Sequence, residues 1–316
     1  MDRSPLVAVV IVNYNGYELT RDCLRSFAEV LYENHALIVV DNASCDGSVG
    51  RLNEEFPQVH YIESTYNTGF TGGNNLGLKK AAALGARFVF FLNNDTVVSP
   101  NILDELVSFS SEHPEVGIVG PLTYYYEARE MVSFGGGNIN RNTGMYVQLH
   151  KDKTVEQVES QVVYCSFIEG AAMFMRTELA AKVGGFSDVY FLTSEESELC
   201  VRTADEGYQL AMITSCSVWH KVSRSLTSGS PLRTYFVARN RLLFVKRNCL
   251  GFGARDFREL AMCYGKSLAW CLIKDRNMAT TKSIVLGILD FFKGSTGAGR
   301  YANKLNACSG RISVPD

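Results

Sequence analysis

Asparagine, aspartate and glycine gather in four short clusters of the sequence, and each cluster follows a run of apolar residues. The clusters are residues 13–16, 41–48, 67–75 and 93–95. If the apolar runs are parallel strands, the clusters lie together at the carboxyl edge of one sheet, where such sheets bind their ligands. These residue types are also common in ordinary turns. Four clusters at one ligand-binding edge nevertheless favour a site for a polar ligand.

The third cluster contains a glycine-rich segment, residues 69–77, which we compared with known phosphate-binding loops. It has neither the G-K-[ST] ending of a P-loop nor the G-x-G-x-x-G spacing of a dinucleotide-binding turn. Backbone N–H groups at the start of a helix can still hold a phosphate group. The segment is therefore compatible with a phosphate-containing ligand but does not identify one.

The elements that must position these clusters alternate between strand and helix. Residues 6–12, 36–40, 59–62 and 87–92 are short apolar runs, typical of strands buried on both faces. Apolar residues recur at helical spacing in the intervening segments, residues 73–84 read as a helix, and Ser99-Pro100 is a favourable start for another. This alternation predicts an α/β fold, Rossmann-like, with a mostly parallel central sheet and helices on both faces.

From about residue 116 the pattern is less regular. Residues 135–144 are rich in glycine and asparagine, which predicts loops and turns. Strand-like runs are residues 163–168 and 171–175, on either side of Glu169-Gly170, and later residues 210–213 and 216–219. A helix is expected over residues 195–206, with Gly207 as its C-terminal stop, and everything after His220 indicates helices.

The composition excludes several classes of protein. The 316 residues are 46% apolar and 20% charged, which is ordinary for a globular protein and excludes a disordered or collagen-like chain. Nine cysteines without a C-x-x-C pair argue against a disulfide scaffold or zinc ribbon and favour a reducing cytosol. The first apolar run is too short to span a membrane and no small-residue cleavage site follows it. We therefore expect a cytoplasmic protein without a signal peptide.

The charge is distributed unevenly along the chain. Residues 1–220 carry 14 Lys and Arg against 28 Asp and Glu, whereas residues 221–316 carry 17 against 5. This basic region contains apolar stretches, but none reaches the roughly 18 residues that a spanning helix needs. Three interpretations stay open: attachment to an anionic membrane surface, a helical cap on the acidic body, and a homodimer interface. No motif supports nucleic-acid binding.

Seven stretches follow one another in a characteristic order: VVIVNYNG (9–16), VVDNASCDGS (39–48), NTGFTGGNNLG (67–77), FFLNNDT (90–96), EGAAMFMR (169–176), VGGFSDVYF (183–191) and EESELCVR (195–202). This series resembles the family 2 inverting glycosyltransferases with a GT-A fold, and most of all the branch of bacterial rhamnosyltransferases and related cell-surface polysaccharide enzymes. The resemblance covers about residues 6–250.

The resemblance implies a nucleoside-diphosphate sugar as the donor. Its base and ribose would lie at the first two strand ends, where Asp41 would accept a hydrogen bond from the base, and its diphosphate and sugar would lie at the next two. The residues assigned to the nucleotide sugar are Asn13, Asn15, Asp41, Asn42, Asn67, Gly73, Asn74, Asn93, Asn94 and Asp95.

The resemblance also implies a bound metal ion. Asn93-Asn94-Asp95 stands where the family has its metal-binding D-x-D motif, and only its last residue is acidic. Mg²⁺ or Mn²⁺ would bridge the two phosphates, since hard cations prefer oxygen ligands, with Asp95 and His220 as the protein ligands. One carboxylate in place of two predicts weak metal affinity without substrate. The local alternatives are a turn or cap for Asp95 and a structural role for His220.

Glu195-Glu196 matches the family's Glu-Asp pair at a helix start. Inverting transfer needs a base for the proton of the acceptor hydroxyl, and a neighbouring carboxylate raises the pKa of such a base. We assign the base to Glu196 and an orienting or acceptor-binding role to Glu195. The reverse assignment stays open, and Thr193 and Glu196 also have the spacing of a capping box. Arg202 on the same helix is expected to pair with an acid of that turn.

The resemblance further implies an acceptor side that contains Glu169, Gly170 and Trp219. It divides the chain into a GT-A catalytic domain, residues 1–225, and a basic helical region, residues 226–316. Within the first domain, residues 1–120 would bind the nucleotide sugar and residues 121–225 the acceptor.

The leading hypothesis is an inverting, metal-dependent glycosyltransferase in cell-surface polysaccharide synthesis. The first expected donor is dTDP-rhamnose, followed by a UDP-hexose, and the acceptor is a glycan or a polyprenyl-diphosphate-linked sugar. We expect it in the cytoplasm, with peripheral attachment to the inner face of the cytoplasmic membrane as one interpretation. The alternatives are a sugar nucleotidyltransferase and a non-catalytic nucleotide-sugar-binding protein of the same fold. Residues 13–16 lack the basic loop of the nucleotidyltransferases, which counts against the first of these.

Overall fold

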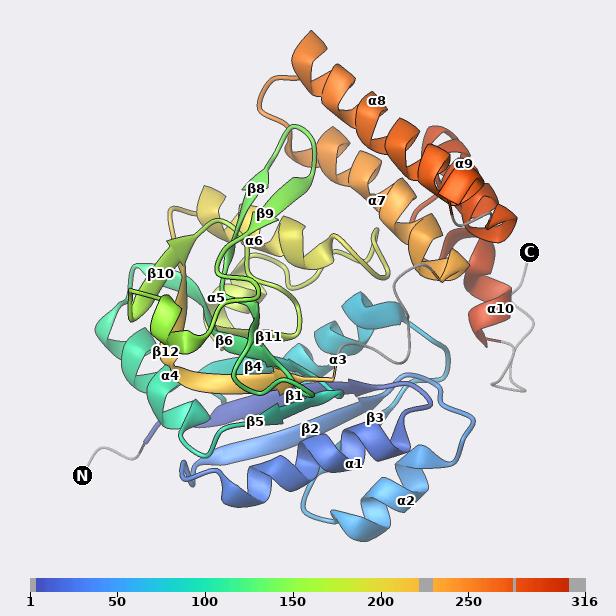
Figure 1. The fold of residues 1–316 in the computed structure, drawn as a ribbon. Helices are drawn as coiled ribbons and strands as arrows, with labels where there is room; N and C mark the ends of the chain where they lie inside the picture. The colour runs from blue at the N-terminus through green and yellow to red at the C-terminus, as the bar shows by residue number, and fades with distance from the viewer. Residues whose placement is uncertain (1–3, 222–229, 275–276, 307–316) are drawn as a thin grey trace.

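The computed structural model describes residues 4–221, 230–274 and 277–306. One mixed sheet forms its centre. Its strands are β1 (Val7–Asn13), β2 (His35–Asp41), β3 (His60–Glu63), β4 (Phe88–Asn93), β5 (Thr96–Val98), β6 (Val116–Tyr125), β7 (Val132–Phe134), β10 (Val162–Cys165), β11 (Ala172–Arg176) and β12 (Gln209–His220). Their main order is β10-β12-β6-β11-β4-β1-β2-β3, with β5 paired to β12 and β7 paired to β6 (Figure 1).

The first four strands are parallel, as the sequence predicts. β1 lies between β2 and β4, with Asn13 opposite Asp41 and Val12 opposite Asn93. The polar clusters that follow these strands therefore begin at one edge of the sheet. Every residue of β1 except Val12 is buried, which explains why the strand reads as a continuous apolar run.

Helices cover both faces of the sheet, as predicted. On one face lie α1 (Tyr17–Ser26) with a 3₁₀ turn (Phe27–Glu29), α2 (Ser48–Glu55) and α4 (Ile102–Glu112); on the other lie α3 (Gly69–Ala83), α5 (Thr177–Lys182) and α6 (Glu195–Asp205). The side chains of β1 alternate between the two cores. Val9 and Ile11 pack in the first core, and Ala8 and Val10 pack in the second.

The second half of the sheet differs from the prediction in several places. β5, β6 and α5 are not predicted. In the first half of the chain, α3 begins at Gly69, four residues before the expected start. The two strand-like runs at 210–213 and 216–219 form a single strand, β12, with an irregularity between Ile213 and Ser217. The polar residues Thr214 and Ser215 fall at this irregularity, which is why the sequence pattern divides there.

The prediction of loops and turns over residues 135–144 is confirmed at residues 135–136 and 141–144 and is wrong at residues 137–140, which form a strand. The segment belongs to a hairpin of β8 (Gly137–Asn140) and β9 (Met145–Gln148), whose strands pair from Gly137–Gln148 to Asn140–Met145. The turn between the two strands contains Asn142 and Gly144, and Gly144 has a φ of 63°. Most of the hairpin residues are exposed or only partly buried, so the strands lack the apolar alternation of a half-buried strand.

The described residues after His220 are mainly helical, as predicted. They form α7 (Pro231–Asn248), α8 (Ala254–Ala269), a π-helical turn (Trp270–Lys274), α9 (Met278–Phe292), a 3₁₀ turn (Gly299–Tyr301) and α10 (Ala302–Asn306). A further 3₁₀ turn, Val155–Gln157, precedes β10. The expected boundary between residues 225 and 226 lies outside the described residues.

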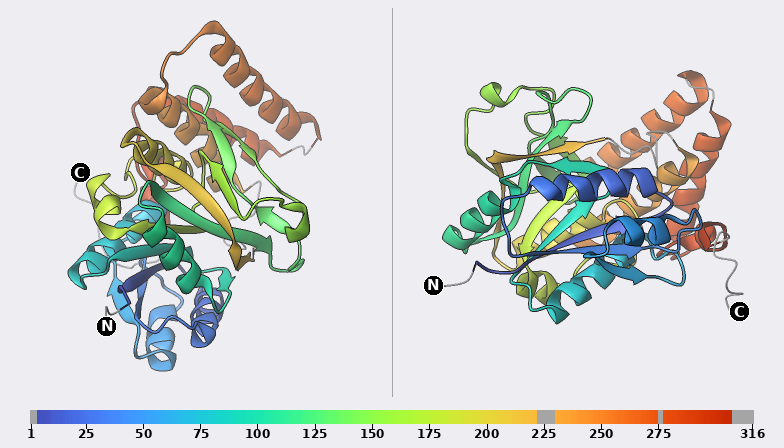
Figure 2. Two further views of the ribbon diagram at one scale, coloured as in Figure 1. Left: turned by 90° about the vertical axis from the view of Figure 1, so that its left-hand side faces the viewer. Right: turned by 90° about the horizontal axis from the view of Figure 1, so that it is seen from below.

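The C-terminal helices pack against the α/β body on one side, as both views of Figure 2 show. α7 makes this contact, because its Phe244 packs with Tyr190 and Val201 and its Phe236 packs with Phe191. Among the described residues, we find no helix that is both long and apolar enough to cross a membrane.

The close packing of α3 on β1 gives a first prediction. A Cβ atom at Gly77 would lie 2.1 Å from Cγ1 of Val10, so Gly77→Ala forces the helix away from the strand. We expect a loss of about 1–3 kcal/mol in the free energy of unfolding in urea, the usual range for overpacking. Gly50→Ala is the matched control, since Gly50 lies in α2 with nothing within 4 Å of the added Cβ. The control should gain about 0.5–1 kcal/mol, because alanine favours helices more than glycine does. Equal effects of the two changes would contradict this packing.

Candidate active site

The ends of β1 and β2 are joined by the buried side chain of Asn13. Its Nδ2 lies 2.8 Å from Oδ1 of Asp41 and 2.8 Å from Oγ of Ser48, and its Oδ1 accepts a hydrogen bond from Thr20 at 2.8 Å. Asp41 also accepts a hydrogen bond from the backbone N–H of Ser44. Asn13 is fully buried and Asp41 nearly so. Asn13 thus holds Asp41 in position, and its predicted contact with a nucleotide stays a prediction.

Asn15 lies at the exposed rim of the same edge. Its φ of 49° is in the left-handed region, which asparagine tolerates better than most residues. Its Oδ1 accepts a hydrogen bond from the N–H of Cys45 at 2.8 Å, and its own N–H donates to Oγ of Ser44 at 2.9 Å. The two loops that follow β1 and β2 are therefore bound to each other.

Asn42 connects the end of β2 to the start of α3. Its Oδ1 accepts a hydrogen bond from the N–H of Thr68, and its Nδ2 donates to Oδ1 of Asn67 and to the carbonyl of Gly69. Asn74, one turn later, donates to the carbonyl of Phe70. The structure thus brings Asn42 and Asn67 together behind the first turn of α3.

Gly73 faces β1 across a close helix–strand contact. A Cβ atom there would lie 2.8 Å from Cγ1 of Val12. Packing alone therefore accounts for glycine at this position. Its predicted place beside the diphosphate is not tested by this contact.

The turn from β4 into β5 carries Asn93, Asn94 and Asp95. Asn94 donates a hydrogen bond to Oγ1 of Thr20 at 3.0 Å. Asp95 is buried, and its Oδ1 lies 3.1 Å from Nε2 of His220. The antiparallel pairing of β5 with β12 sets Thr96 opposite His220 and so brings the two predicted metal ligands together.

The Asp95–His220 pair has ligand types that suit the predicted metal ion, but the two side chains do not complete a site for it. Burial lowers the pKa of His220, but the hydrogen bond and negative charge of Asp95 raise it, and the net shift is upward. Among the described residues no cluster of three or more His, Cys, Asp or Glu side chains could hold a metal ion. One carboxylate and one imidazole fit a hard cation only if a substrate supplies further oxygen ligands.

Glu195 and Glu196 form the first turn of α6. Burial and the adjacent charge of Glu196 raise the pKa of Glu195 well above its usual range, and burial also raises the pKa of Glu196. The Oε2 atom of each has no hydrogen-bond partner among the described residues. The predicted capping box is not formed, since Ser194 is the N-cap residue and the Thr193 hydroxyl has no hydrogen-bond partner among the described residues.

The loop before α6 has an unusual backbone conformation. Phe191, Thr193 and Ser194 have φ values of 68°, 69° and 71°, in the left-handed region that side chains disfavour. Each residue in this conformation raises the free energy of the folded state by on the order of 1–3 kcal/mol, and the conformation persists only where its surroundings fix it. One such contact is at Gly69, where a Cβ atom would lie 2.3 Å from the carbonyl oxygen of Phe191.

The predicted acceptor-side residues Glu169 and Gly170 lie next to the glutamate pair. A Cβ atom at Gly170 would lie 3.5 Å from Cβ of Glu196. Burial raises the pKa of Glu169, which also senses the charges of His220, Glu196 and Asp95. The metal-ligand pair and the candidate base therefore both lie near Glu169.

Trp219 and Tyr146 both lie between residues 121 and 225, where the acceptor side is predicted. The indole N–H of Trp219 donates to the carbonyl of Arg129, and its ring stacks on Tyr124 at a centroid distance of 6.2 Å. Tyr146 on β9 is not predicted as a site residue. Partial desolvation raises its pKa although its exposed fraction is 46%, and the charges of Glu196 and Glu169 raise it further, so it lies close to both. The sequence gives no local signal for it, because the hairpin itself is not predicted.

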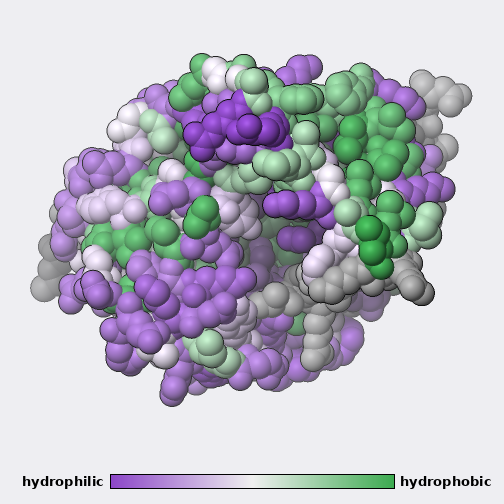
Figure 3. Space-filling view, turned by 45° about the horizontal axis from the view of Figure 1, so that its top comes forward, coloured by the Kyte–Doolittle hydropathy of each residue, from purple (hydrophilic) through white to green (hydrophobic). Residues whose placement is uncertain are grey.

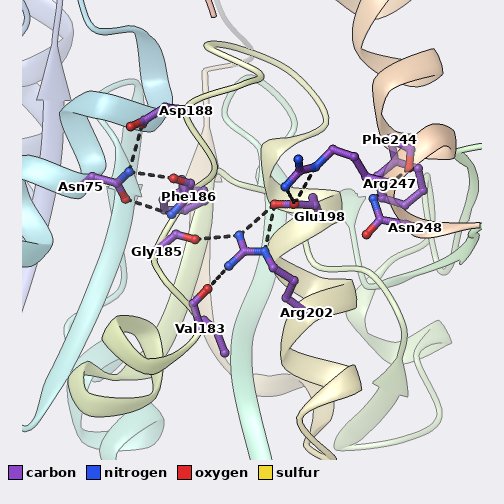
Figure 4. Close-up of polar contacts among 10 residues, drawn as sticks. All are labelled: Asn75, Val183, Gly185, Phe186, Asp188, Glu198, Arg202, Phe244, Arg247 and Asn248. Atoms are coloured by element: carbon purple, nitrogen blue, oxygen red, sulfur yellow. Dashed lines mark hydrogen bonds and ion pairs between the residues drawn. The ribbon is translucent and has the colours of Figure 1, made fainter. Parts of the chain in front are cut away.

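Glu198, one turn into α6, is the buried acid that holds this helix in place. It accepts hydrogen bonds from Arg202 at 2.9 Å and from Arg247 of α7 at 3.1 Å (Figure 4). Arg202 also donates to the carbonyls of Val183 and Gly185, in the loop before α6. The expected pairing of Arg202 with an acid of its turn is confirmed, whereas the second arginine, from α7, is not predicted.

Comparison with known proteins identifies the chain's relatives. The family model for Glycosyl transferase family 2 matches residues 8–174. The chain is 22% identical to the dTDP-rhamnosyl transferase RfbF of Shigella flexneri over 93% of this chain and 98% of that protein. It is also 22% identical to the N-acetylglucosaminyl-diphospho-decaprenol L-rhamnosyltransferase of Mycobacterium tuberculosis, over 76% of this chain and 83% of that protein.

Solved structures share the fold at lower identity. The mannosyltransferase PcManGT from Pyrobaculum calidifontis, in complex with GDP-Man and Mn²⁺, has a TM-score of 0.57 at 16% identity and covers 92% of this chain and 88% of its own. S. aureus TarS 1-349 in complex with UDP-GlcNAc has a TM-score of 0.58 at 15% identity, over 92% of this chain and 81% of its own.

The sheet, its helical layers and these neighbours show the GT-A fold with a C-terminal helical extension. The chain belongs to glycosyl transferase family 2, in the rhamnosyltransferase-like branch.

The buried glutamate pair gives a prediction about stability. Because the pKa of Glu195 is raised, the folded protein binds its proton more tightly than the unfolded chain does. The resulting loss of stability is absent below the ordinary glutamate pKa of about 4.3, grows as the pH rises from there towards the raised value, and is complete above that value. We expect Glu195→Gln to raise the melting temperature at a pH of about 8 and to leave it unchanged at a pH of about 4, as measured by calorimetry.

The control for this experiment is Glu29→Gln, at an exposed side chain, which should change the melting temperature at neither pH. A Glu195→Gln variant with the same melting-temperature difference at both pH values would show that Glu195 does not carry the buried charge.

Proposed function

We propose that this chain transfers a sugar, with inversion, from a nucleoside-diphosphate sugar to a hydroxyl group of a glycan or of a polyprenyl-diphosphate-linked acceptor. The observation that carries the proposal is the arrangement around Glu169. The pKa of Glu169 responds to the charges of Asp95 and His220, which contact each other, and to the charge of Glu196, whose own pKa is raised, so all of them lie near it. One group suited to the diphosphate and one suited to the acceptor hydroxyl thus share a site.

The names of the relatives support a particular donor. The Shigella flexneri relative is a dTDP-rhamnosyl transferase, and the Mycobacterium tuberculosis relative is an L-rhamnosyltransferase acting on a diphospho-decaprenol-linked sugar. We therefore propose dTDP-rhamnose as the first donor to test and a UDP-hexose as the second. Asp41, held by Asn13 at the end of β2, is the acceptor for a hydrogen bond from the base.

The residues at the sheet edge suit a divalent cation, Mg²⁺ or Mn²⁺. Asp95 and His220 are its proposed protein ligands, with Asn93 and Asn94 in the same turn. When bound, the ion would neutralise negative charge on the departing nucleoside diphosphate. Two protein ligands require the diphosphate to complete the site, so metal and nucleotide should bind together.

The candidate base is Glu196. In the transfer step its carboxylate takes the proton of the acceptor hydroxyl while that oxygen attacks the anomeric carbon. The bond from this carbon to the phosphate oxygen breaks, and the nucleoside diphosphate leaves with the electron pair. Burial keeps the pKa of Glu196 raised, which makes it a stronger base than an exposed glutamate. Glu195 and Glu169 lie close enough to orient the acceptor.

The basis of this mechanism is tested with Glu196→Gln, Glu195→Gln and Asp95→Asn in a product assay and a nucleotide-binding assay. We expect Glu196→Gln to lower kcat by about 10²–10⁴-fold, the usual contribution of a general base, with dTDP binding unchanged. Asp95→Asn should instead abolish the Mn²⁺-dependent part of the thermal shift that dTDP, UDP or GDP produces.

The outcomes separate the alternatives. A larger loss in Glu195→Gln than in Glu196→Gln would reverse the assignment of the base. A wild-type protein that binds nucleotide but forms no product with any donor would be a binding protein. Metal-independent nucleotide binding in the wild type would exclude the metal role of Asp95.

We also propose that the C-terminal helices contact an anionic membrane surface. The position of α7 agrees with a helical cap on the acidic body, because its Arg247 pairs with the buried Glu198 of that body. α8, α9 and the turn between them instead expose large apolar side chains: Phe257, Met262, Trp270, Leu272, Ile273, Met278, Leu289 and Phe292. Exposed basic residues lie on the same helices, namely Arg255, Arg258, Lys266 and Lys282. Figure 3 shows apolar residues gathered on the right of the surface.

Flotation with vesicles tests this surface. Ile273 and Phe292 have exposed fractions of 78% and 76%, and we expect Ile273→Ser with Phe292→Ser to weaken binding to phosphatidylglycerol vesicles by about tenfold or more. Leu31→Ser is the matched control, since Leu31 is 68% exposed but lies in the acidic half, and it should leave binding unchanged. Equal binding by both variants and the wild type would exclude this membrane contact, and concentration-dependent self-association lost in the double variant would indicate a dimer interface.

A further inference from the structure

Two fully buried polar residues lie next to each other on α7. Arg239 and Asn240 each have an exposed fraction of 0%. The Arg239 guanidinium is hydrogen-bonded to no carboxylate among the described residues. Its Nη2 donates instead to the backbone carbonyls of Tyr190 at 3.1 Å and Gly297 at 2.7 Å. Burial of a cation costs free energy, and these hydrogen bonds, with one from Nη1 to the Tyr235 hydroxyl beside Asp290, offset part of that cost.

The hydrogen bond between the two side chains fixes the orientation of the Asn240 amide. Nε of Arg239 donates to Oδ1 of Asn240 at 2.9 Å, and a guanidinium can only donate. The Nδ2 of Asn240 therefore faces the loop before α6. It donates to three backbone carbonyls, those of Tyr190 at 2.9 Å, Leu192 at 2.7 Å and Thr193 at 3.0 Å.

The loop that receives these bonds is the segment with the left-handed backbone. Phe191, Thr193 and Ser194 all have positive φ values, and for β-branched threonine this conformation is a clear outlier. Hydrogen bonds to three carbonyls within four residues hold such a backbone against its tendency to relax. Glu195 and Glu196 follow directly, so the loop conformation decides where their carboxylates point.

We propose that Arg239 and Asn240 are positioning residues, which hold the loop at residues 190–194 so that Glu195-Glu196 projects into the active site. Asn240 makes the contacts, and Arg239 orients its amide and adds a bond to the same loop. The inference rests on the proposed role of the glutamate pair as the catalytic base.

This role predicts an effect on the pH profile. If the loop relaxes, water reaches the glutamate pair and the desolvation that raises its pKa is reduced. Among the described residues, the other charged or titratable groups that interact with Glu196 are Glu169, Tyr146, Cys200 and Arg233, and the variants leave all four in place. In a plot of kcat against pH, the rise on the acid side (the acid limb) should therefore move to lower pH, and the maximal kcat should fall.

The test compares Asn240→Asp and the milder Asn240→Ser with the wild-type protein. Aspartate keeps the shape and the bond from Arg239 but cannot donate to the loop carbonyls. We expect kcat to fall by roughly 10–10²-fold, the scale of a misplaced catalytic group, with the donor KM changed less than about twofold. The acid limb should shift downward, and amide hydrogen exchange in residues 190–196 should accelerate.

Arg176→Gln is the matched control. The Arg176 guanidinium also donates to three backbone carbonyls, those of Ser110, His113 and Val116. Arg176 lies opposite Phe88, at the far end of β4 from Asp95. This variant should lose stability but keep the wild-type kcat, acid limb and exchange in residues 190–196.

The outcomes distinguish the inference from the proposed function. If Glu196→Gln and Glu195→Gln both lose activity while the Asn240 variants keep the wild-type kcat and pH profile, the positioning role is overturned. Asn240 variants that resemble Arg176→Gln, with lower stability alone, overturn it as well. If neither glutamine variant loses activity, the assignment of the base fails, and with it the inference, whatever the exchange data show.

Discussion

The pairing of β12 with β5 is the contact on which the rest of the site depends. β12 runs parallel to β6 and then pairs with the short β5, so that His220 lies opposite Thr96. This pairing brings Asp95 and His220 within 3.1 Å although they are 125 positions apart in the sequence. β11, which pairs with β4 and with β6, joins the earlier and later strands into one sheet, and α6 packs against both β6 and β12. Any change that separates β5 from β12 would therefore open the site at its centre.

The C-terminal helices contribute to the site as well as to the surface. Arg247 of α7 binds the buried Glu198, and Asn240 binds the loop that leads into Glu195. The basic charge of this region is thus used in two ways. Arg247 neutralises an acid inside the body, whereas the exposed basic residues of α8 and α9 lie on the same helices as exposed apolar side chains.

The parallel half of the sheet could be predicted because a strand buried on both faces reads as a continuous apolar run, as residues 7–12 do. β6 could not, since Gly117, Gly120 and Pro121 interrupt its run, nor could β8 and β9, which bury few side chains. The candidate site residues at the strand ends could be predicted from the same pattern, because their position depends only on where the strands end. Asn240 could not be found in this way, since its partners lie 47 to 50 positions away and nothing local separates a buried asparagine from an exposed one.

Tyr14, at the end of β1, donates a hydrogen bond to the carbonyl of Leu305 on α10, so early and late parts of the described chain meet beside the first strand end. This contact bears on the order of assembly during synthesis on the ribosome, where amino-terminal parts fold first. A nascent chain that has extended through β12 holds every strand of the central sheet. It has neither the α7 side chains that fix the loop before Glu195 nor the α10 contact at Tyr14. The sheet edge would therefore be in place before the loop that carries the glutamates is fixed.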